Sequence, residues 1–216
     1  VWDRRLRILR ERTRQVVGRG RVRLSQGTVH VHDGAVEIEL ELEEEPGLEV
    51  LTPAGGAYIW TRKQGGVPAR GRVRLDGREL ALDARAIVDE SAGYHDRRTS
   101  WRWSAGVGTD ADGRALAWNL AEGIHDHPAA SERTVWVDGV PAEVAPVRIS
   151  PDLATIDFAG GERLRCAPEA VRRRRDRLLV LSSDYEQPFG TFAGTLPGGI
   201  ELTEGHGVTE RHDVLW

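Results

Sequence analysis

Hydrophobic and polar residues alternate along much of this chain with a period of two. Valine, isoleucine and leucine take every second position of residues 36–42, and glutamates take the positions between them. Similar alternation recurs around 73–75, 80–82, 116–120 and 135–137. Because successive side chains of a strand point to opposite faces, this period predicts strands with one apolar face.

Turn-forming pairs separate these stretches. They are Asp33-Gly34, Asp76-Gly77, Asp112-Gly113, Asp138-Gly139, Gly160-Gly161 and Gly198-Gly199. Such pairs tolerate the positive φ angles of tight hairpins. The sequence therefore predicts an all-β antiparallel meander, which manages its edges by closing into a barrel or by packing as a sandwich.

Two segments depart from this pattern. Residues 2–17 carry Leu6, Leu9 and Val16 among many arginines, which favours a helix, although Val1-Trp2 equally fits the end of a strand. Residues 168–176 are too short and too charged for a helix of consequence. Their run Arg172–Arg175 is interpreted as a solvated turn or strand end rather than as a nucleic-acid patch.

Composition narrows the class of protein. Charged residues make up 30% of the 216 residues and the net charge is −4, which does not favour nucleic-acid binding. Lys63 is the only lysine, a usage that is interpreted as coding bias, and Cys166 is the only cysteine, so no intramolecular disulfide forms. With no apolar leader and no membrane span, a cytoplasmic location is expected. The lack of an initial methionine suggests either a non-standard start codon or a chain cut from a longer one.

An aromatic segment beside titratable groups carries the strongest functional signal. On a strand, Trp101 and Trp103 fall on one face, and Tyr94, His95 and Asp96 lie just upstream. Such a face lines a ligand cavity or forms an ordinary core. Tyr185 and Gln187 are further candidates for a cavity mouth. Glu132 beside Arg133, and Glu210 beside Arg211 and His212, are interpreted as ion pairs between strand ends.

Metal and nucleotide sites are not expected. The pairs His30/His32 and His125/His127 have a spacing that suits zinc or copper, but the sequence names no third ligand. The glycine-rich pieces lack the strand–loop–helix context of a phosphate loop. No cofactor is therefore expected.

Several motifs resemble those of a known bacterial family, the domain of unknown function 2804. They are AYIWTRKQGG, RGRVRLDGRELALDARAIVD, GYHDRRTSWRWSAGVG, LAWNLAEG, SERTVWVDG, QPFGTFAGTLP and EGHGVTERHDVLW, within residues 12–216. Members of that family carry additional N-terminal strands. More distantly, the order of these motifs is similar to the lipocalin-like superfamily of carotenoid hydratases. That resemblance implies two calycin-type β-barrels and an acidic role for Asp89, with Ile87 where that superfamily has an aromatic residue.

The expected architecture is an antiparallel calycin/lipocalin-like β-barrel at residues 89–216, preceded at residues 1–88 by strands of a second, incomplete barrel. An exposed edge of that partial barrel favours homo-oligomers. The closing segment, ending in Trp216, is expected to bury its last ring.

Three functional hypotheses follow. The first is a binding protein for a hydrophobic, lipid- or isoprenoid-like small molecule; its ligand-contacting residues are Tyr94, Trp101, Trp103, Trp118 and Tyr185. The second is a cofactor-independent hydratase or isomerase with Asp89 as general acid and His95 as its partner. The third is a truncated, inactive family member.

Overall fold

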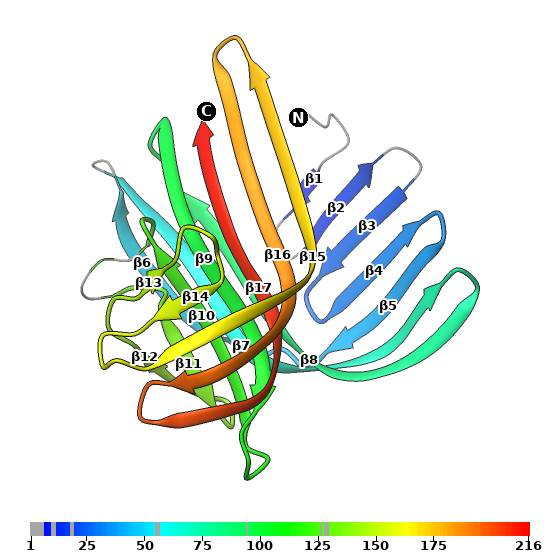
Figure 1. Cartoon of the computed structure of the whole chain (residues 1–216). Helices are drawn as coiled ribbons and strands as arrows, with labels where there is room; N and C mark the ends of the chain where they lie inside the picture. The colour runs from blue at the N-terminus through cyan, green and yellow to red at the C-terminus, as the bar shows by residue number, and fades with distance from the viewer. Residues whose placement is uncertain are drawn as a thin grey trace. The chain divides into compact units, whose positions relative to one another are not determined.

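The computed structural model describes residues 7–9, 12–17, 20–54, 57–93, 95–125, 127 and 130–216, and its regular structure there is entirely β (Figure 1). The strands are β1 (Arg7–Leu9), β2 (Arg12–Val17), β3 (Gly20–Ser25), β4 (Thr28–Asp33), β5 (Val36–Leu42), β6 (Leu48–Ala54), β7 (Ala57–Leu75), β8 (Arg78–Gly93), β9 (Arg98–Thr109), β10 (Ala115–Glu122), β11 (Thr134–Val137), β12 (Val140–Glu143), β13 (Arg148–Ile149), β14 (Thr155–Asp157), β15 (Arg163–Leu178), β16 (Leu181–Leu196) and β17 (Ile200–Leu215). No described segment forms a helix long and apolar enough to cross a membrane.

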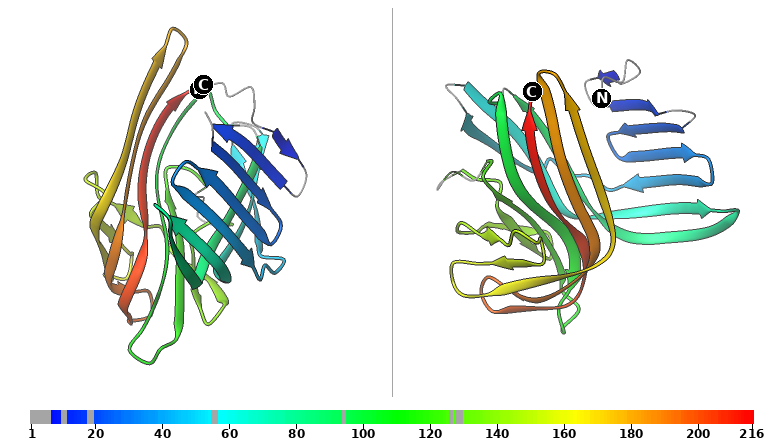
Figure 2. Two further views of the ribbon diagram at one scale, coloured as in Figure 1. Left: turned by 90° about the vertical axis from the view of Figure 1, so that its right-hand side faces the viewer. Right: turned by 45° about the horizontal axis from the view of Figure 1, so that its top comes forward.

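The strands form two antiparallel sheets. The first has the order β1-β2-β3-β4-β5-β7-β6, with β8 also paired to β7, and the second has the order β12-β11-β10-β9-β17-β16-β15-β14-β13. The long strands of the second sheet curl strongly along their length (Figure 2). The predicted all-β, lipocalin-like fold is confirmed.

The chain divides into two compact units. Unit 1 comprises Val1–Pro46 and Val67–Ala86, and unit 2 comprises Gly47–Gly66 and Ile87–Trp216. Strands β7 and β8 run through both units. Unit 2 therefore contains β6, the first part of β7, the last part of β8 and the whole second sheet.

Strand β10 explains how the second sheet is packed. Its residues are buried on both faces, which suits its sequence of leucine, tryptophan and small residues. Leu116, Trp118 and Leu120 face the hydrophobic core of unit 2. The buried residues of that core are Leu116, Trp118, Leu120, Val135, Val147, Ile149, Leu153, Ile156, Phe158, Leu164, Cys166, Phe192, Leu196 and Leu202.

The other face of β10 is covered closely by β7. Here the sequence requires a glycine, because a Cβ at Gly65 would lie 2.4 Å from the Trp136 ring and 3.0 Å from the Ala117 Cβ. Small side chains on this face let β7 approach, and that approach brings Lys63 of β7 over the second sheet.

Two expectations from the sequence are wrong. The segment expected to be helical contains β1 and β2, because its residues pair in register, Arg7 with Arg14 and Arg12 with Ser25; Trp2 lies outside the described residues. Trp216 is 51% exposed instead of buried, although β17 itself is central in its sheet and Val214 is buried. The run Arg172–Arg175 is exposed and lies in the last part of β15, which fits its interpretation as a solvated strand end.

Candidate functional site

A pocket of about 380 Å³ lies within unit 2 over β9, β10 and β17. Strand β7 contributes Lys63, β8 contributes Asp89 and Ser91, and the loops contribute histidines. The residues that line it are Lys63, Asp89, Ser91, His95, Trp101, Trp103, Ala121, Ile124, His125, Glu132, Glu210 and Trp216. Aromatic rings and titratable side chains thus meet in one hollow.

Trp101 and Trp103 form one wall of the pocket. They stand two apart on β9, so both rings lie on the face opposite the hydrophobic core. The Trp101 Nε1–H donates to Glu210 Oε1 at 2.8 Å, and the Trp103 Nε1–H donates to Asn119 Oδ1 at 2.9 Å. These bonds fix both rings, which leaves rigid apolar surface toward the pocket.

Glu210 is a partly buried carboxyl of the pocket. Besides Trp101, it accepts a hydrogen bond from Gln187 Nε2 at 2.9 Å and is bonded to Tyr185. Burial raises the pKa of Glu210, and the negative charge of Asp89 raises it further, against the lowering effect of the hydrogen bonds. Burial and the neighbouring Glu210 also raise the pKa of Tyr185 well above its usual range. Glu210 therefore retains its proton to a higher pH than an ordinary glutamic acid.

Lys63 connects two other carboxylates. Its Nζ lies 2.5 Å from Asp89 Oδ1 and 2.7 Å from Glu132 Oε2, and only 4% of its side chain is exposed. Burial lowers the pKa of Lys63, while the adjacent Asp89 acts in the opposite direction. Asp89 is about one-third exposed, whereas Glu132 is buried. The lysine thus holds two carboxylates of the pocket lining, one partly exposed and one buried.

Two histidines complete the polar side of the pocket. The His125 Nδ1 contacts the Glu132 carboxylate, and His125 has a φ of 51°, in the left-handed region that non-glycine residues seldom adopt. His95 lies between two rings, with centroid distances of 6.0 Å to His125 and 6.3 Å to Trp216. Backbone conformations as sparsely populated as that of His125 cluster at sites where a fold positions a functional side chain.

The family assignment follows from the whole chain. The model of the domain of unknown function DUF2804 matches residues 3–216. This chain belongs to the DUF2804 family. The assignment made from the sequence motifs is confirmed, and no curated protein sequence matches the chain significantly.

Two solved structures resemble this DUF2804 protein. One is a candidate AttH protein from Nitrosomonas europaea, with a TM-score of 0.46 and 13% identity, over 88% of this chain and 64% of the other. The second is kievitone hydratase from Nectria haematococca, with a TM-score of 0.46 and 10% identity, over 86% of this chain and 64% of the other. The DUF2804 chain thus spans 64% of the length of each of these proteins.

The structure brings together only some of the residues named from the sequence. Asp89, His95, Trp101 and Trp103 line the pocket. Tyr185 reaches it through Glu210. By contrast, Trp118 lies in the core on the opposite face of the sheet, where its Nε1–H donates to Ser104 Oγ at 3.0 Å.

Tyr94 lies outside the described residues, so its predicted ligand contact stays a prediction. Sequence reasoning missed Lys63, Glu132 and Glu210 as pocket residues. The available signal was the single lysine in an arginine-rich chain, because arginine is not a substitute where a cation must be compact or lose its proton.

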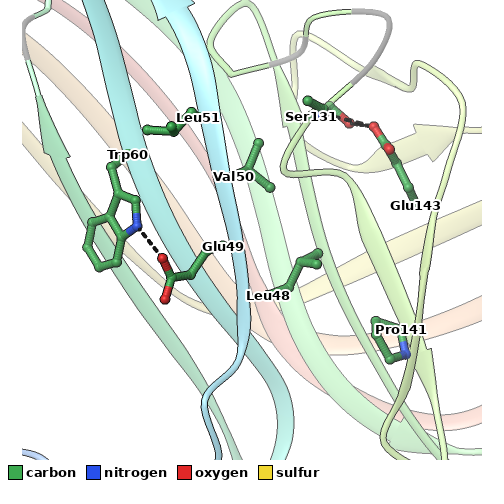
Figure 3. Close-up of a pocket in the computed structure, with 9 residues that line it drawn as sticks. Leu48, Glu49, Val50, Leu51, Trp60, Ser131, Pro141 and Glu143 are labelled. Atoms are coloured by element: carbon green, nitrogen blue, oxygen red, sulfur yellow. Dashed lines mark hydrogen bonds between the residues drawn. The ribbon is translucent and has the colours of Figure 1, made fainter.

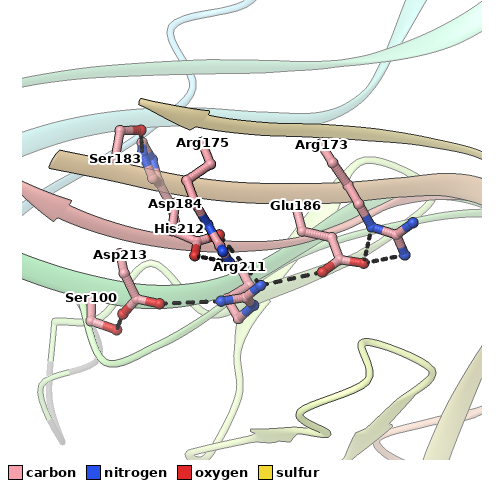
Figure 4. Close-up of polar contacts among 9 residues, drawn as sticks. All are labelled: Ser100, Arg173, Arg175, Ser183, Asp184, Glu186, Arg211, His212 and Asp213. Carbon is pink, nitrogen blue, oxygen red and sulfur yellow. Dashed lines mark hydrogen bonds and ion pairs between the residues drawn. The ribbon is translucent and has the colours of Figure 1, made fainter. Parts of the chain in front are cut away.

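The acidic and basic residues near the C-terminus divide between two faces of the sheet. Arg211 joins Glu186 at 3.3 Å and Asp213 at 3.4 Å, in a network that also includes Arg173 and Arg175 (Figure 4). Its neighbours Glu210 and His212 point the other way, as alternation along β17 requires. The ion-pair interpretation therefore describes Arg211 but not Glu210.

The histidine pairs His30/His32 and His125/His127 have the spacing of metal ligands. Among the described residues, no three His, Cys, Asp or Glu side chains gather in an arrangement that would hold a metal ion. His32 instead lies 3.4 Å from Glu37 across a hairpin of unit 1.

A second hollow of unit 2, of about 570 Å³, lies between β6 and β12. Leu48, Val50 and Pro141 line it, while its polar groups bond to one another (Figure 3). The residues that bond in this way are Trp60 with Glu49, at 2.9 Å, and Ser131 with Glu143, at 2.7 Å. Both carboxyl groups of this hollow are occupied by these bonds, and the hydrogen bonds from Ser131 lower the pKa of Glu143. The Lys63 pocket, which combines a carboxyl of raised pKa with a buried lysine and histidines, is the better functional candidate.

Proposed function

We propose that unit 2 binds a small molecule with an apolar body in the Lys63 pocket. There it acts as a hydratase or isomerase, which transfers protons to and from the bound molecule. One observation carries this proposal. Glu210, a carboxyl with a raised pKa, lies in the same pocket as Asp89, a carboxylate that the buried Lys63 holds. Two carboxyl groups with different environments are the usual arrangement for an acid and a base at one site.

The acid role fits Glu210 better than Asp89. The second hypothesis from the sequence gave this role to Asp89, but Asp89 is about one-third exposed and bonds to Lys63. Glu210 is desolvated, and the Tyr185 hydroxyl beside it can donate to the ionised carboxyl or accept from the protonated one. Asp89 then serves as the base, with Lys63 orienting it.

In a hydration, the Glu210 proton adds to one carbon of an alkene, and the π electrons form that new C–H bond. Water adds its oxygen to the other carbon and gives its proton to Asp89. In an isomerisation, Asp89 instead removes a proton from a carbon while Glu210 supplies one elsewhere on the same molecule. Trp101 and Trp103 hold the apolar body beside these groups.

The test uses isotopes from the solvent. Farnesol, geraniol and oleic acid are incubated with the protein in H₂¹⁸O and, separately, in D₂O. The masses of the recovered compounds are then measured by mass spectrometry. We expect ¹⁸O, or deuterium bound to carbon, to enter at least one probe. Positioned acids and bases contribute about 10²–10⁴-fold to rate, so Glu210→Gln should lower incorporation by about that factor.

The matched control is Glu204→Gln, which alters an exposed glutamate on the same strand. It should leave incorporation unchanged. A probe that binds the wild type tightly without incorporating either isotope would contradict the enzyme and favour a binding protein. Equal losses in the two variants would contradict the role of Glu210.

A further inference from the structure

The hairpin formed by β15 and β16 ends in an apolar tip. Leu178 pairs with Leu181, so Leu179 and Val180 form the two-residue turn between them. The exposed fractions are 61% for Leu178, 108% for Leu179 and 62% for Val180. These are consecutive side chains, so they form a continuous apolar surface rather than scattered single residues.

This turn differs in chemistry from other tight turns of the chain. The turns Asp76-Gly77 and Asp138-Gly139 use polar or small residues, and all four of these residues have positive φ angles. Turns at the surface favour such residues because they suit the backbone and are well solvated. Leucine and valine offer neither advantage in a turn. They lower the free energy only when another surface covers their apolar side chains.

The stem below the tip is cationic. Residues 172–177 contain five arginines and one acidic residue, Asp176. Arg173, Arg174 and Arg175 pair with Glu186, Asp176 and Asp184, yet the guanidinium-bearing side chains are 48–69% exposed.

The arginines of the stem exceed its acidic residues, which number three between residues 172 and 187. An apolar tip above exposed arginines complements a bilayer surface, where acyl chains lie beneath phosphate groups.

The hairpin also extends past the end of β17 (Figure 1). Leu215, near the end of β17, pairs with Ser182, and the next residue, Trp216, lines the Lys63 pocket. The tip and one side of the pocket therefore lie at the same end of the second sheet. A surface that received the tip would be near a pocket suited to apolar molecules.

We propose that the Leu178–Leu181 tip inserts into the interface of a membrane that contains anionic lipids, with the arginines of β15 contacting lipid phosphates. The surface that the tip contacts is a lipid bilayer, because exposed aliphatic side chains suit its acyl chains and the arginine-rich stem suits its phosphate groups. This membrane docking is independent of any reaction in the pocket.

The first test is flotation with phosphatidylcholine vesicles, with and without phosphatidylglycerol. We expect the wild type to float with the anionic vesicles, and added salt to weaken the binding because screening reduces the attraction of exposed charges. Leu179→Ser/Val180→Ser should reduce binding at least about tenfold, since it removes most of the apolar area that the bilayer would cover. Val140→Ser, an equally exposed apolar residue beside another turn, is the matched control and should bind as the wild type does.

The second test places an environment-sensitive fluorophore on the tip through Leu179→Cys. The native Cys166 is buried, and burial raises the pKa of its thiol, so the label goes to the new cysteine. Anionic vesicles should shift the emission of this label to the blue and leave a label at Val140→Cys unchanged.

Failure of the wild type to float with anionic vesicles would overturn the proposal. So would unchanged binding by the Leu179→Ser/Val180→Ser variant. A dimer that dissociates in this variant, with no vesicle binding, would show that a second copy covers the tip. Vesicle binding by Glu210→Gln should equal that of the wild type, which separates this result from the fate of the proposed reaction.

Discussion

Replacing Lys63 with methionine tests how the pocket is held together. The change removes the cation between Asp89 and Glu132 while keeping an unbranched side chain of similar length. Breaking a buried ion pair by removing one partner costs about 3–5 kcal/mol, because the remaining charge stays desolvated. Glu132 is buried but Asp89 is about one-third exposed, so the lower end applies, and we expect a loss of about 3 kcal/mol.

Urea denaturation followed by tryptophan emission measures this loss. Six of the seven tryptophans belong to unit 2, so the signal reports mainly on the unit that contains the pocket. A loss of that size corresponds to a melting temperature lower by roughly 6–12 °C. Lys63→Met/Glu132→Gln should regain about half of the lost stability, because it removes the uncompensated charge as well.

The matched control is Arg163→Met, which breaks an exposed ion pair with Asp157 in the same unit. Exposed pairs contribute about 0–1 kcal/mol, so this variant should unfold almost as the wild type does. A loss from Lys63→Met no larger than that from Arg163→Met would show that the buried network is not a significant source of stability.

Other variants test the core, the aromatic wall and the acid. Trp118→Ala should cost about 3–5 kcal/mol of unfolding free energy, because Trp118 is fully buried, whereas Trp216→Ala should cost far less; calorimetry compares them. Trp101→Phe and Trp103→Phe should each cost under about 1.5 kcal/mol yet weaken the binding of apolar probes in fluorescence titrations. Burial raises the pKa of Glu210, so its protonated form stabilises the fold at acidic pH and that contribution is lost as pH rises through the raised pKa. As the pH increases from acidic to neutral, the melting temperature of Glu210→Gln should therefore rise relative to that of the wild type. Melting temperatures that change in parallel with pH would contradict this.

The sequence predicts the architecture well because strand period and turn chemistry are local. Alternation at residues 36–42 and the pair Asp138-Gly139 each specify their own structure. The segment at residues 7–17 was misjudged because its arginines and leucines suit a helix, while pairing with Gly20–Ser25 makes it a strand. Tertiary pairing overrides such local preferences.

The pocket is only partly predictable for a related reason. Trp101 and Trp103 are two apart, so their common face follows from the sequence alone. Lys63 meets Glu132 across 69 residues of chain, and nothing local shows that contact. Glu210 was assigned to an ion pair because its neighbour Arg211 is close in sequence, yet strand alternation directs the two side chains to opposite faces.

The most direct test of the central claim, that the Lys63 pocket binds small molecules, is a proton–nitrogen NMR spectrum of the ¹⁵N-labelled tryptophan indoles. Single Trp→Phe variants assign the signals, and the apolar probes named above are then added. We expect a bound probe to shift the indole signals of Trp101 and Trp103, whose N–H groups bond to Glu210 and Asn119 beside the pocket. The signal of Trp118, in the core, should stay unchanged. A bound probe that shifts Trp118 while the signals of Trp101 and Trp103 stay in place would contradict the claim.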